Sequence, residues 1–272
     1  MEKYSRSQRV AAITKCLIEN PNKTINLNCF TEVFNAAKSS ISEDIVIVRD
    51  VLDKLDAGTI ETISGASGGV RYISKISDKE RLDFAVKLCE ILKEKSRIIP
   101  GNFIYITDIM CNPEIVHKAA VILSHKFSEL ELDYVVTIET KGVPLAYEVA
   151  RMLGVQLIIV RRDSKVTEGP TVSINYVSGS NKRIQSMSLS KRSMKKGSKC
   201  IFIDDFMRAG GTALGIIDLL TEFESEILGI GVLVDHVEKK KKLIDNYVSI
   251  IQYNGISEGG FADLVPSIEQ KK

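Results

Sequence analysis

The chain has 272 residues, of which 44% are hydrophobic and 26% charged, and its formal net charge is +2. These values are ordinary for a globular protein with room for two domains, and they exclude a protein that is basic over its whole surface. The five scattered cysteines argue against disulfides and zinc, and no apolar run approaches about 20 residues, so we expect a cytoplasmic protein without a membrane partner.

Residues 1–75 are predicted to form a compact helical unit. Val10, Ile13 and Leu17 recur at helical spacing and predict a first helix. A second, shorter helix is expected over residues 27–35, where the apolar side chains again share one face. Helices this short need one another to bury their apolar faces, so we expect them to pack together.

The third helix has the clearest predicted start, because Ser40-Ile41-Ser42-Glu43 has the pattern of a capping box. After Gly58, two runs typical of strands, Thr59 to Ile63 and Val70 to Ile73, are joined by a glycine-rich tip. Three helices followed by such a hairpin, or wing, predict a winged helix-turn-helix whose third helix enters a DNA major groove.

DNA contacts are expected at the start of the chain, at the start of the third helix and in the wing. Glu43 and Asp44 suit the helix dipole there, but they would repel phosphates unless they face away or accept from cytosine N4. A small helical domain for protein contacts or dimerisation is the alternative. The candidate DNA-binding residues are Lys3, Arg6, Arg9, Lys38, Ser39, Ser40, Ser42, Gly68 and Arg71.

Residues 76–272 have a different pattern, in which short apolar strands alternate with helices. This alternation predicts an α/β domain with a parallel sheet covered by helices on both faces, and a ligand site at the carboxyl ends of its strands. Strands are expected at Phe103–Ile106, Tyr134–Ile138, Val155–Val160, Cys200–Ile203 and Ile227–Val234, and helices near Leu82–Leu92, at Pro113–Leu130, at Pro144–Leu153 and from Thr212.

One segment combines groups that suit a sugar phosphate. A buried strand is expected to deliver Asp204 and Asp205 to a short loop that contains Gly210 and Gly211 and opens a helix at Thr212. Glycines allow backbone amides to approach a phosphate, and the helix dipole favours its charge, whereas carboxylates suit sugar hydroxyls or a metal ion. A strand end with two exposed acids is one alternative. A Walker B strand is another, but the absence of a P-loop motif argues against it.

Two further segments suit anions. Thr140-Lys141-Gly142 forms a loop between an apolar strand and a helix. Residues 161–199 contain ten basic residues and two acidic ones, a local net charge of +8 in a chain whose total is +2. Such a stretch can contact a polyphosphate, extend a DNA-binding surface or form a solvated face.

The segment from Cys200 to Thr212 resembles the signature of type I phosphoribosyltransferases for 5-phosphoribosyl-1-pyrophosphate (PRPP), in which an apolar strand, two acids and a small-residue loop end in Gly-Gly-Thr. The loop at Lys141 and Gly142 matches the pyrophosphate loop of that family, which often contains a strained peptide bond. The basic insertion matches its mobile flap. The resemblance implies a PRPP site.

Nearly the whole chain resembles the purine operon repressors of Gram-positive bacteria. That resemblance implies a homodimer that represses purine biosynthesis genes by binding double-stranded operator DNA, with PRPP as an effector that weakens this binding and without transferase activity. Guanosine tetraphosphate is implied as a competing ligand. The matching segments are Ala37–Asp44, Gly68–Val70, Lys141–Ala146, Lys165–Gly169, Val172–Ser180 and Ile203–Met207.

The implied effector site has three parts: Asp204 and Asp205 for the ribose hydroxyls, Arg208 to Thr212 for the 5′-phosphate, and Thr140 to Gly142 with Mg²⁺ for the pyrophosphate. Phe103 takes the place of an aromatic residue that lies over the pocket in relatives, where a tyrosine would add a hydroxyl. No catalytic residue and no protein metal site are expected. An active purine or xanthine phosphoribosyltransferase with a regulatory N-terminal domain and an interaction scaffold remain alternatives. The full set is Phe103, Thr140, Lys141, Gly142, Asp204, Asp205, Phe206, Met207, Arg208, Ala209, Gly210, Gly211 and Thr212.

Overall fold

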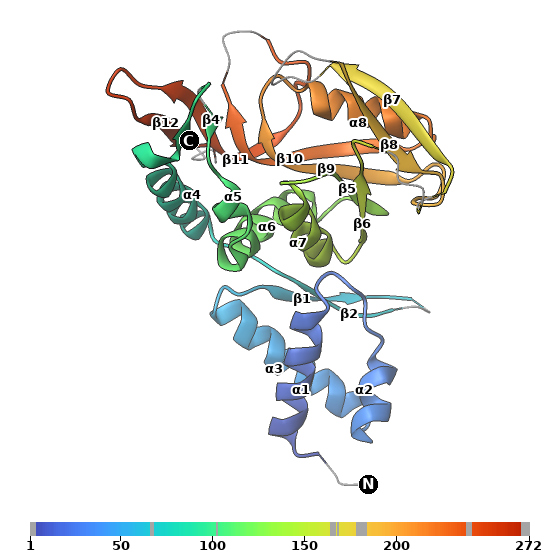
Figure 1. Cartoon of the computed structure of the whole chain (residues 1–272). Helices are drawn as coiled ribbons and strands as arrows, with labels where there is room; N and C mark the ends of the chain where they lie inside the picture. Colours follow the sequence, from blue (N-terminus) through green and yellow to red (C-terminus); the bar gives the residue numbers. More distant parts are fainter. Residues whose placement is uncertain are drawn as a thin grey trace. The chain divides into compact units, whose positions relative to one another are not determined.

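The structure is a computed structural model that describes residues 4–65, 68–101, 103–163, 167, 169–177, 184–237 and 241–267 (Figure 1). The chain divides into two compact units. Unit 1 comprises Met1–Ser77 with Arg151–Gly154, and unit 2 comprises Asp78–Ala150 with Val155–Lys272. Among the described residues, no helix is long and apolar enough to cross a membrane.

Unit 1 has the predicted order of three helices and a hairpin. A capping box begins the first helix, because Ser5 and Gln8 each accept a hydrogen bond from the other's backbone N–H. The second helix ends at Asn35, which adopts the left-handed conformation. The elements are α1 (Arg6–Glu19), α2 (Leu27–Phe34), α3 (Lys38–Lys54), β1 (Thr59–Ile63) and β2 (Gly69–Ile73), the two strands being antiparallel.

The predicted capping box at Ser40 is wrong. Helix α3 begins at Lys38 after Ala37, which makes no side-chain cap bond. Ser40 therefore lies inside the first turn, and the Ser42 hydroxyl donates to the Lys38 carbonyl over 2.9 Å. The Ala37 carbonyl already accepts a hydrogen bond from the Ile41 N–H over 3.1 Å, so the helix begins before Ser40 can serve as its N-cap.

The core of unit 1 lies between the three helices and the hairpin. Its members come from every element, so the hairpin is part of the packed unit. Tyr72 also donates its hydroxyl to the Ala57 carbonyl over 2.6 Å, which ties β2 to the end of α3. The buried residues are Ile13, Leu17, Phe30, Phe34, Ile41, Ile45, Val48, Leu52, Ile60, Val70 and Tyr72.

Unit 2 contains a six-stranded sheet, which confirms the predicted α/β class. The strand order is β12-β11-β10-β9-β5-β6, with neighbouring strands parallel except for β12, which is an antiparallel edge strand. The strands are β5 (Tyr134–Ile138), β6 (Gln156–Val160), β9 (Lys199–Met207), β10 (Glu226–His236), β11 (Val248–Ile256) and β12 (Ala262–Pro266). The last two lie in a region for which the sequence predicted no element.

Helices cover both faces of this sheet. On one face, Phe127 of α6 comes so close to β10 that a Cβ atom at Gly229 would lie 2.5 Å from its ring, and a Cβ atom at Gly231 would lie 2.9 Å from Ile203 Cδ1 and 3.2 Å from the same ring. Helix α4 packs beside α6 against β11 and β12, and α8 covers the opposite face. The helices are α4 (Asp78–Leu92), α5 (Thr107–Met110), α6 (Pro113–Phe127), α7 (Val143–Leu153) and α8 (Gly211–Thr221), with a short 3-10 helix, η1 (Lys95–Arg97).

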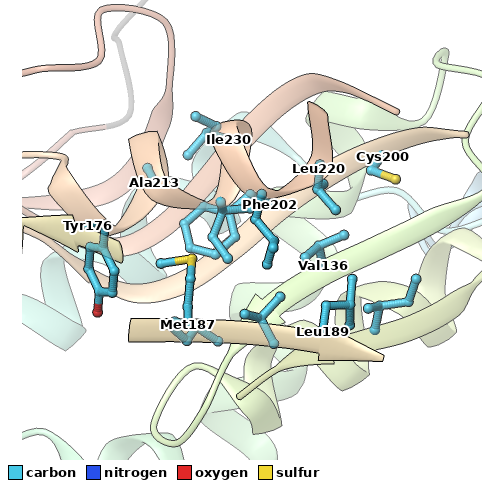
Figure 2. Packing of buried hydrophobic residues seen from close by; sticks show 14 of the residues in the cluster. Val136, Tyr176, Met187, Leu189, Cys200, Phe202, Ala213, Leu220 and Ile230 are labelled. Atoms are coloured by element: carbon cyan, nitrogen blue, oxygen red, sulfur yellow. The ribbon is translucent and has the colours of Figure 1, made fainter. Parts of the chain in front are cut away.

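The basic insertion contains an antiparallel hairpin, β7 (Thr171–Val177) with β8 (Ile184–Ser190). Its inner side chains, Tyr176, Met187 and Leu189, are buried with Phe202 in the core beside α8 (Figure 2). Although the family resemblance implies a mobile flap, the described part of this hairpin is a component of the main core. Lys165, Glu168, Lys182 and Arg183 lie outside the described residues.

The strand predicted over Phe103–Ile106 is much shorter and lies outside the main sheet. Strand β4 (Phe103–Ile104) pairs only with β3 (Ile98–Ile99), and α5 follows directly. Arg97 binds both carboxylate oxygens of Asp108 in α5, over 2.8 and 2.7 Å, which holds the small hairpin against this helix.

Candidate functional site

A cavity of about 470 Å³ lies at the carboxyl ends of β5 and β9 in unit 2. Of the thirteen residues predicted to bind a ligand there, only Gly142 does not line it. The cavity therefore brings together segments that are about 60 residues apart in the chain, as expected for the carboxyl ends of parallel strands.

Gly142 has a supporting position behind the cavity. A Cβ atom at this residue would be 2.5 Å from Asp204 Oδ1 and 3.1 Å from Asp204 Cα, so any side chain would force the two segments apart. The peptide bond between Glu139 and Thr140, at the start of the same loop, is cis. Thr140–Gly142, the Lys-Gly loop, is thus held directly against the carboxylate that the sequence assigned to the sugar.

Asp204 and Asp205 lie inside β9, which continues to Met207, and not in a loop after Ile203 as predicted. The extension exists because β10 is also long and pairs with β9 as far as Met207. Asp204 is 8% exposed. Burial, and then the charge of Asp205, raise the pKa of Asp204 well above its usual range. The backbone N–H of Asp205 donates to Asp204 Oδ1 over 2.9 Å.

The segment Arg208–Thr212, the glycine loop, ends in a helix N-terminus. Helix α8 begins at Gly211, one residue earlier than predicted, and its N-cap Gly210 has a φ of 84°. No side chain caps this terminus, so its first amides point toward the cavity edge without a side-chain acceptor. Such a terminus favours an anion. The Arg208 guanidinium lies 5.7 Å from the centroid of the Phe103 ring.

The sequence did not identify two parts of the cavity. The first is Arg162, whose backbone N–H donates to Glu139 Oε1 over 2.7 Å and whose Nε donates to the Glu139 carbonyl over 3.3 Å. Its place at the end of β6, the strand next to β5, was the available signal. The second part is an apolar wall, in which Ile99, Ile104 and Ile106 join the predicted Phe103.

The cavity offers positive groups near both loops and a pair of acids between them. Lys141 and Arg162 lie near one end, and Arg208 lies near the helix N-terminus. Next to Gly142 and outside the cavity lining, the Thr137 hydroxyl is fully buried and has no hydrogen-bond partner among the described residues. Within the part of the chain that the structure describes, no three potential ligands cluster around a metal position. A divalent cation would therefore need oxygens from a bound phosphate and water.

In unit 1, two of the predicted DNA contacts form ion pairs with the acids at the start of α3. Arg9 Nε lies 2.6 Å from Asp44 Oδ2, and the Asp44 side chain is fully buried. Arg6 lies 3.3 Å from Glu43 and 3.4 Å from Asp44, but 57% of its side chain is exposed. Arg9 thus has a structural partner that the sequence did not reveal, and Asp44 faces the interior.

The remaining predicted DNA contacts have mixed positions. Lys38, Ser39 and Ser42 are exposed at the start of α3, whereas Ser40 is half-buried. In the wing, Arg71 donates to Glu61 on the neighbouring strand over 2.7 Å. Gly68 is partly exposed beside the tip, and Lys3 lies outside the described residues. The exposed start of α3 is therefore the best-formed part of the predicted DNA-binding surface.

Comparisons with known proteins assign a family to each part of the chain. Residues 5–74 match the family described as "Bacterial purine repressor, N-terminal". Residues 106–263 match the family described as "Phosphoribosyl transferase domain". The first match covers the three helices and the wing, and the second covers most of the cavity.

Several relatives match almost the full chain. It is 47% identical to the "Purine biosynthesis transcriptional repressor PurR" of Bacillus subtilis over 255 residues, which are 94% of this chain and 90% of that one. It is 41% identical to the "Purine biosynthesis transcriptional activator PurR" of Lactococcus lactis subsp. lactis, over 92% of this chain and 93% of the relative. The resemblance that the sequence showed is thereby confirmed.

Solved structures confirm the fold of unit 2. The adenine phosphoribosyltransferase of Rhodothermus marinus superposes with a TM-score of 0.53 at 23% identity, over 62% of this chain and 99% of the enzyme. The enzyme of Thermoanaerobacter pseudethanolicus gives the same TM-score at 20% identity. On these matches, the chain belongs to the family of regulators of purine biosynthesis in which a purine repressor N-terminal domain binds DNA and precedes a phosphoribosyltransferase domain.

Proposed function

We propose that this protein is a homodimeric repressor of purine biosynthesis genes whose affinity for operator DNA is lowered when PRPP binds in the cavity of unit 2. The observation that carries this proposal is the convergence of the Lys-Gly loop, the acid pair and the glycine loop on one cavity. PRPP has a pyrophosphate, a diol and a 5′-phosphate, and the three groups of residues match them in kind.

The acid pair, Asp204 and Asp205, favours a ligand in which a sugar lies between two phosphate groups. Carboxylates repel phosphate but accept hydrogen bonds from vicinal hydroxyls, so Asp204 and Asp205 fix the ribose. The uncapped N-terminus of α8 and Arg208 suit the 5′-phosphate, and Lys141 with Arg162 suits the pyrophosphate. Mg²⁺ would arrive with the pyrophosphate and retain several waters, since the described residues form no cage for it.

Guanosine tetraphosphate is a second ligand that the cavity favours. The wall of Ile99, Phe103, Ile104 and Ile106 is apolar, and PRPP has no group that needs it. A purine ring can stack on Phe103 while its phosphates occupy the charged parts of the cavity. We therefore propose that it competes with PRPP and leaves operator binding intact.

Repression is proposed because the Bacillus subtilis repressor is more similar to this chain than the Lactococcus lactis activator. Loss of transferase activity is proposed because these two relatives are named as transcriptional regulators. The alternative, a working phosphoribosyltransferase, has support from an adenine phosphoribosyltransferase of Clostridium botulinum that is 31% identical over 60% of this chain. Pyrophosphate release from PRPP in the presence of adenine, guanine, hypoxanthine or xanthine would establish that alternative.

The test is fluorescence anisotropy of a labelled purine-operon control region, titrated with the full-length protein at about 150 mM salt, because salt sets the non-specific background. We expect binding at least about 1,000-fold tighter than to random DNA, and weaker binding after PRPP and Mg²⁺ are added. Coupling of about 1–3 kcal/mol between effector and operator is typical of such regulators. Equal affinity for both DNAs would reject the repressor, and operator binding that ignores PRPP would reject the effector.

A further inference from the structure

A short segment outside the cavity braces the glycine loop from behind. The backbone N–H of Leu243 donates to the carbonyl of Ala209 over 3.0 Å. A Cβ atom at Gly210 would lie 3.3 Å from both Ile244 Cγ1 and the Ile244 backbone nitrogen. The segment 241–247, the strap, therefore follows the glycine loop closely, although none of its residues lines the cavity.

One buried carboxylate anchors the strap at two points. Asp235, in β10, is 4% exposed and forms an ion pair with Lys242 through Oδ1. Its Oδ2 accepts a hydrogen bond from the Tyr247 hydroxyl over 3.0 Å. Lys242 is itself largely buried, and Ile244 and Tyr247 pack against the main core. Both ends of the strap are thus fixed to one side chain.

Asp235 also lies next to the strand that carries the glycine loop. It pairs in register with Met207, the last residue of β9, and the glycine loop begins at the following residue. A shift of the strap would move the Ala209 carbonyl and the left-handed Gly210, and with them the first amides of α8. The strap therefore lies where it can set the orientation of the group that the proposed function assigns to the 5′-phosphate.

We propose that Asp235, Lys242 and Tyr247 are positioning residues that set the affinity of the glycine loop for a sugar 5′-phosphate. They do so without contact to the ligand, by holding the strap against Ala209 and Gly210. The inference rests on the proposed effector site. It adds that a change in the strap should alter binding at the 5′-phosphate subsite and not at the pyrophosphate subsite, because the described contacts of the strap are with Ala209 and Gly210 of the glycine loop.

The experiment uses calorimetric titration of the full-length protein with two probes, ribose 5-phosphate and magnesium pyrophosphate. In the Asp235→Asn/Lys242→Gln double variant, which keeps this buried position neutral, ribose 5-phosphate should bind at least about tenfold more weakly. Pyrophosphate should bind within about twofold of the unaltered protein, a change too small to indicate a lost contact. Lys242→Arg, which keeps the charge pair, should restore most of the ribose 5-phosphate affinity.

Lys196→Gln is the matched control, because Lys196 forms an exposed ion pair with Glu224 in the same unit, over 2.7 Å. It should change neither affinity. Thermal melting of each variant checks that unit 2 is folded. Equal weakening of both probes, or no weakening of either, would overturn the role of the strap. If the unaltered protein binds neither probe, the proposed effector site is rejected, and the role of the strap with it.

Discussion

Two clusters of charged residues, one in each unit, are arranged in opposite ways. At the start of α3 in unit 1, Arg9 and Asp44 neutralise each other, and the acid has no exposure at all. At the end of β9 in unit 2, Asp204 and Asp205 lie side by side against an open cavity. An ion pair whose partners neutralise each other stabilises the fold. Two neighbouring carboxyl groups instead indicate a position where a ligand supplies the missing hydrogen-bond partners.

The largest effect is expected from removing the acid pair. In Asp204→Asn/Asp205→Asn, PRPP should bind at least about 100-fold more weakly, because the two carboxyl groups that accept from the ribose hydroxyls are replaced by amides. Operator affinity without PRPP should be unchanged. Anisotropy with and without PRPP measures both quantities, and exposed Asp218→Asn on α8 is the control. A double variant that still responds normally to PRPP would place the ligand elsewhere.

The next effect concerns the buried ion pair of unit 1. Arg9→Met should lower the free energy of unfolding of unit 1 by about 3 kcal/mol, because it removes the buried partner of the Asp44 carboxylate and leaves it with Arg6, which is largely exposed. Arg6→Met should lower it by less than about 1 kcal/mol, since more than half of Arg6 is exposed. Denaturant unfolding followed by far-ultraviolet circular dichroism measures both. If Arg9→Met unfolds like the unaltered protein but loses operator affinity, Arg9 is a DNA contact and the contrast between the units fails.

A third effect follows from the raised pKa of Asp204, whose first cause is burial. A raised pKa means that the folded state binds the proton more tightly than the unfolded state. The resulting stability is present at low pH and is lost as the pH rises through the folded-state value. Asp204→Asn should therefore melt at a higher temperature than the unaltered protein at neutral and alkaline pH, and the difference should shrink on acidification.

Asp108→Asn provides a control of opposite sign. Arg97 lowers the pKa of Asp108 through a hydrogen bond, so the stability from Asp108 is present at neutral pH and lost as the pH falls. That variant should melt lower than the unaltered protein at neutral pH. Melting curves across the pH range that shift in the same direction for both variants would contradict this account.

The smallest effect is expected at the exposed start of α3. Lys38→Gln should reduce the salt slope of operator binding by about 0.9, the value for one lost phosphate contact, and should leave the melting temperature unchanged. Lys54→Gln, in the last turn of α3, is the control, because Lys54 pairs with Asp50 over 2.7 Å. An unchanged salt slope in Lys38→Gln would remove this end of the helix from the DNA-binding surface.

Much of the fold could be predicted because apolar patterns dictate buried elements. Strand β5 has the predicted bounds, and the strand that carries Asp204 and the helix after it lie where the sequence placed them within a few residues. The cavity could also be predicted, since the carboxyl ends of parallel strands meet at one edge. Twelve of the thirteen predicted residues line it, and their prediction depended on that rule and on the family resemblance.

The errors arose where a local pattern competed with a tertiary constraint. Ser40 and Glu43 have the spacing of a capping box, but the helix begins earlier, where the Ala37 carbonyl accepts from the Ile41 N–H. The partner of Arg9 lies 35 residues away in the chain, and no local rule reveals such a pair. The net charge of residues 161–199 obscured the hairpin β7–β8, because neither strand contains a basic residue and the alternate side chains that face the core do not contribute to a charge count.

The packing of the hairpin β7–β8 on α8 limits which substitutions this sequence can accept. A Cβ atom at Gly215 would lie 2.8 Å from the Met187 Cε atom and 3.0 Å from the Tyr176 Cβ atom. These positions come from three different elements, yet they share one small volume. A larger residue at 215 would displace the Met187 side chain and the strand at Tyr176, so substitutions at 215 should be accompanied by substitutions at 176 or 187 among descendants of this sequence.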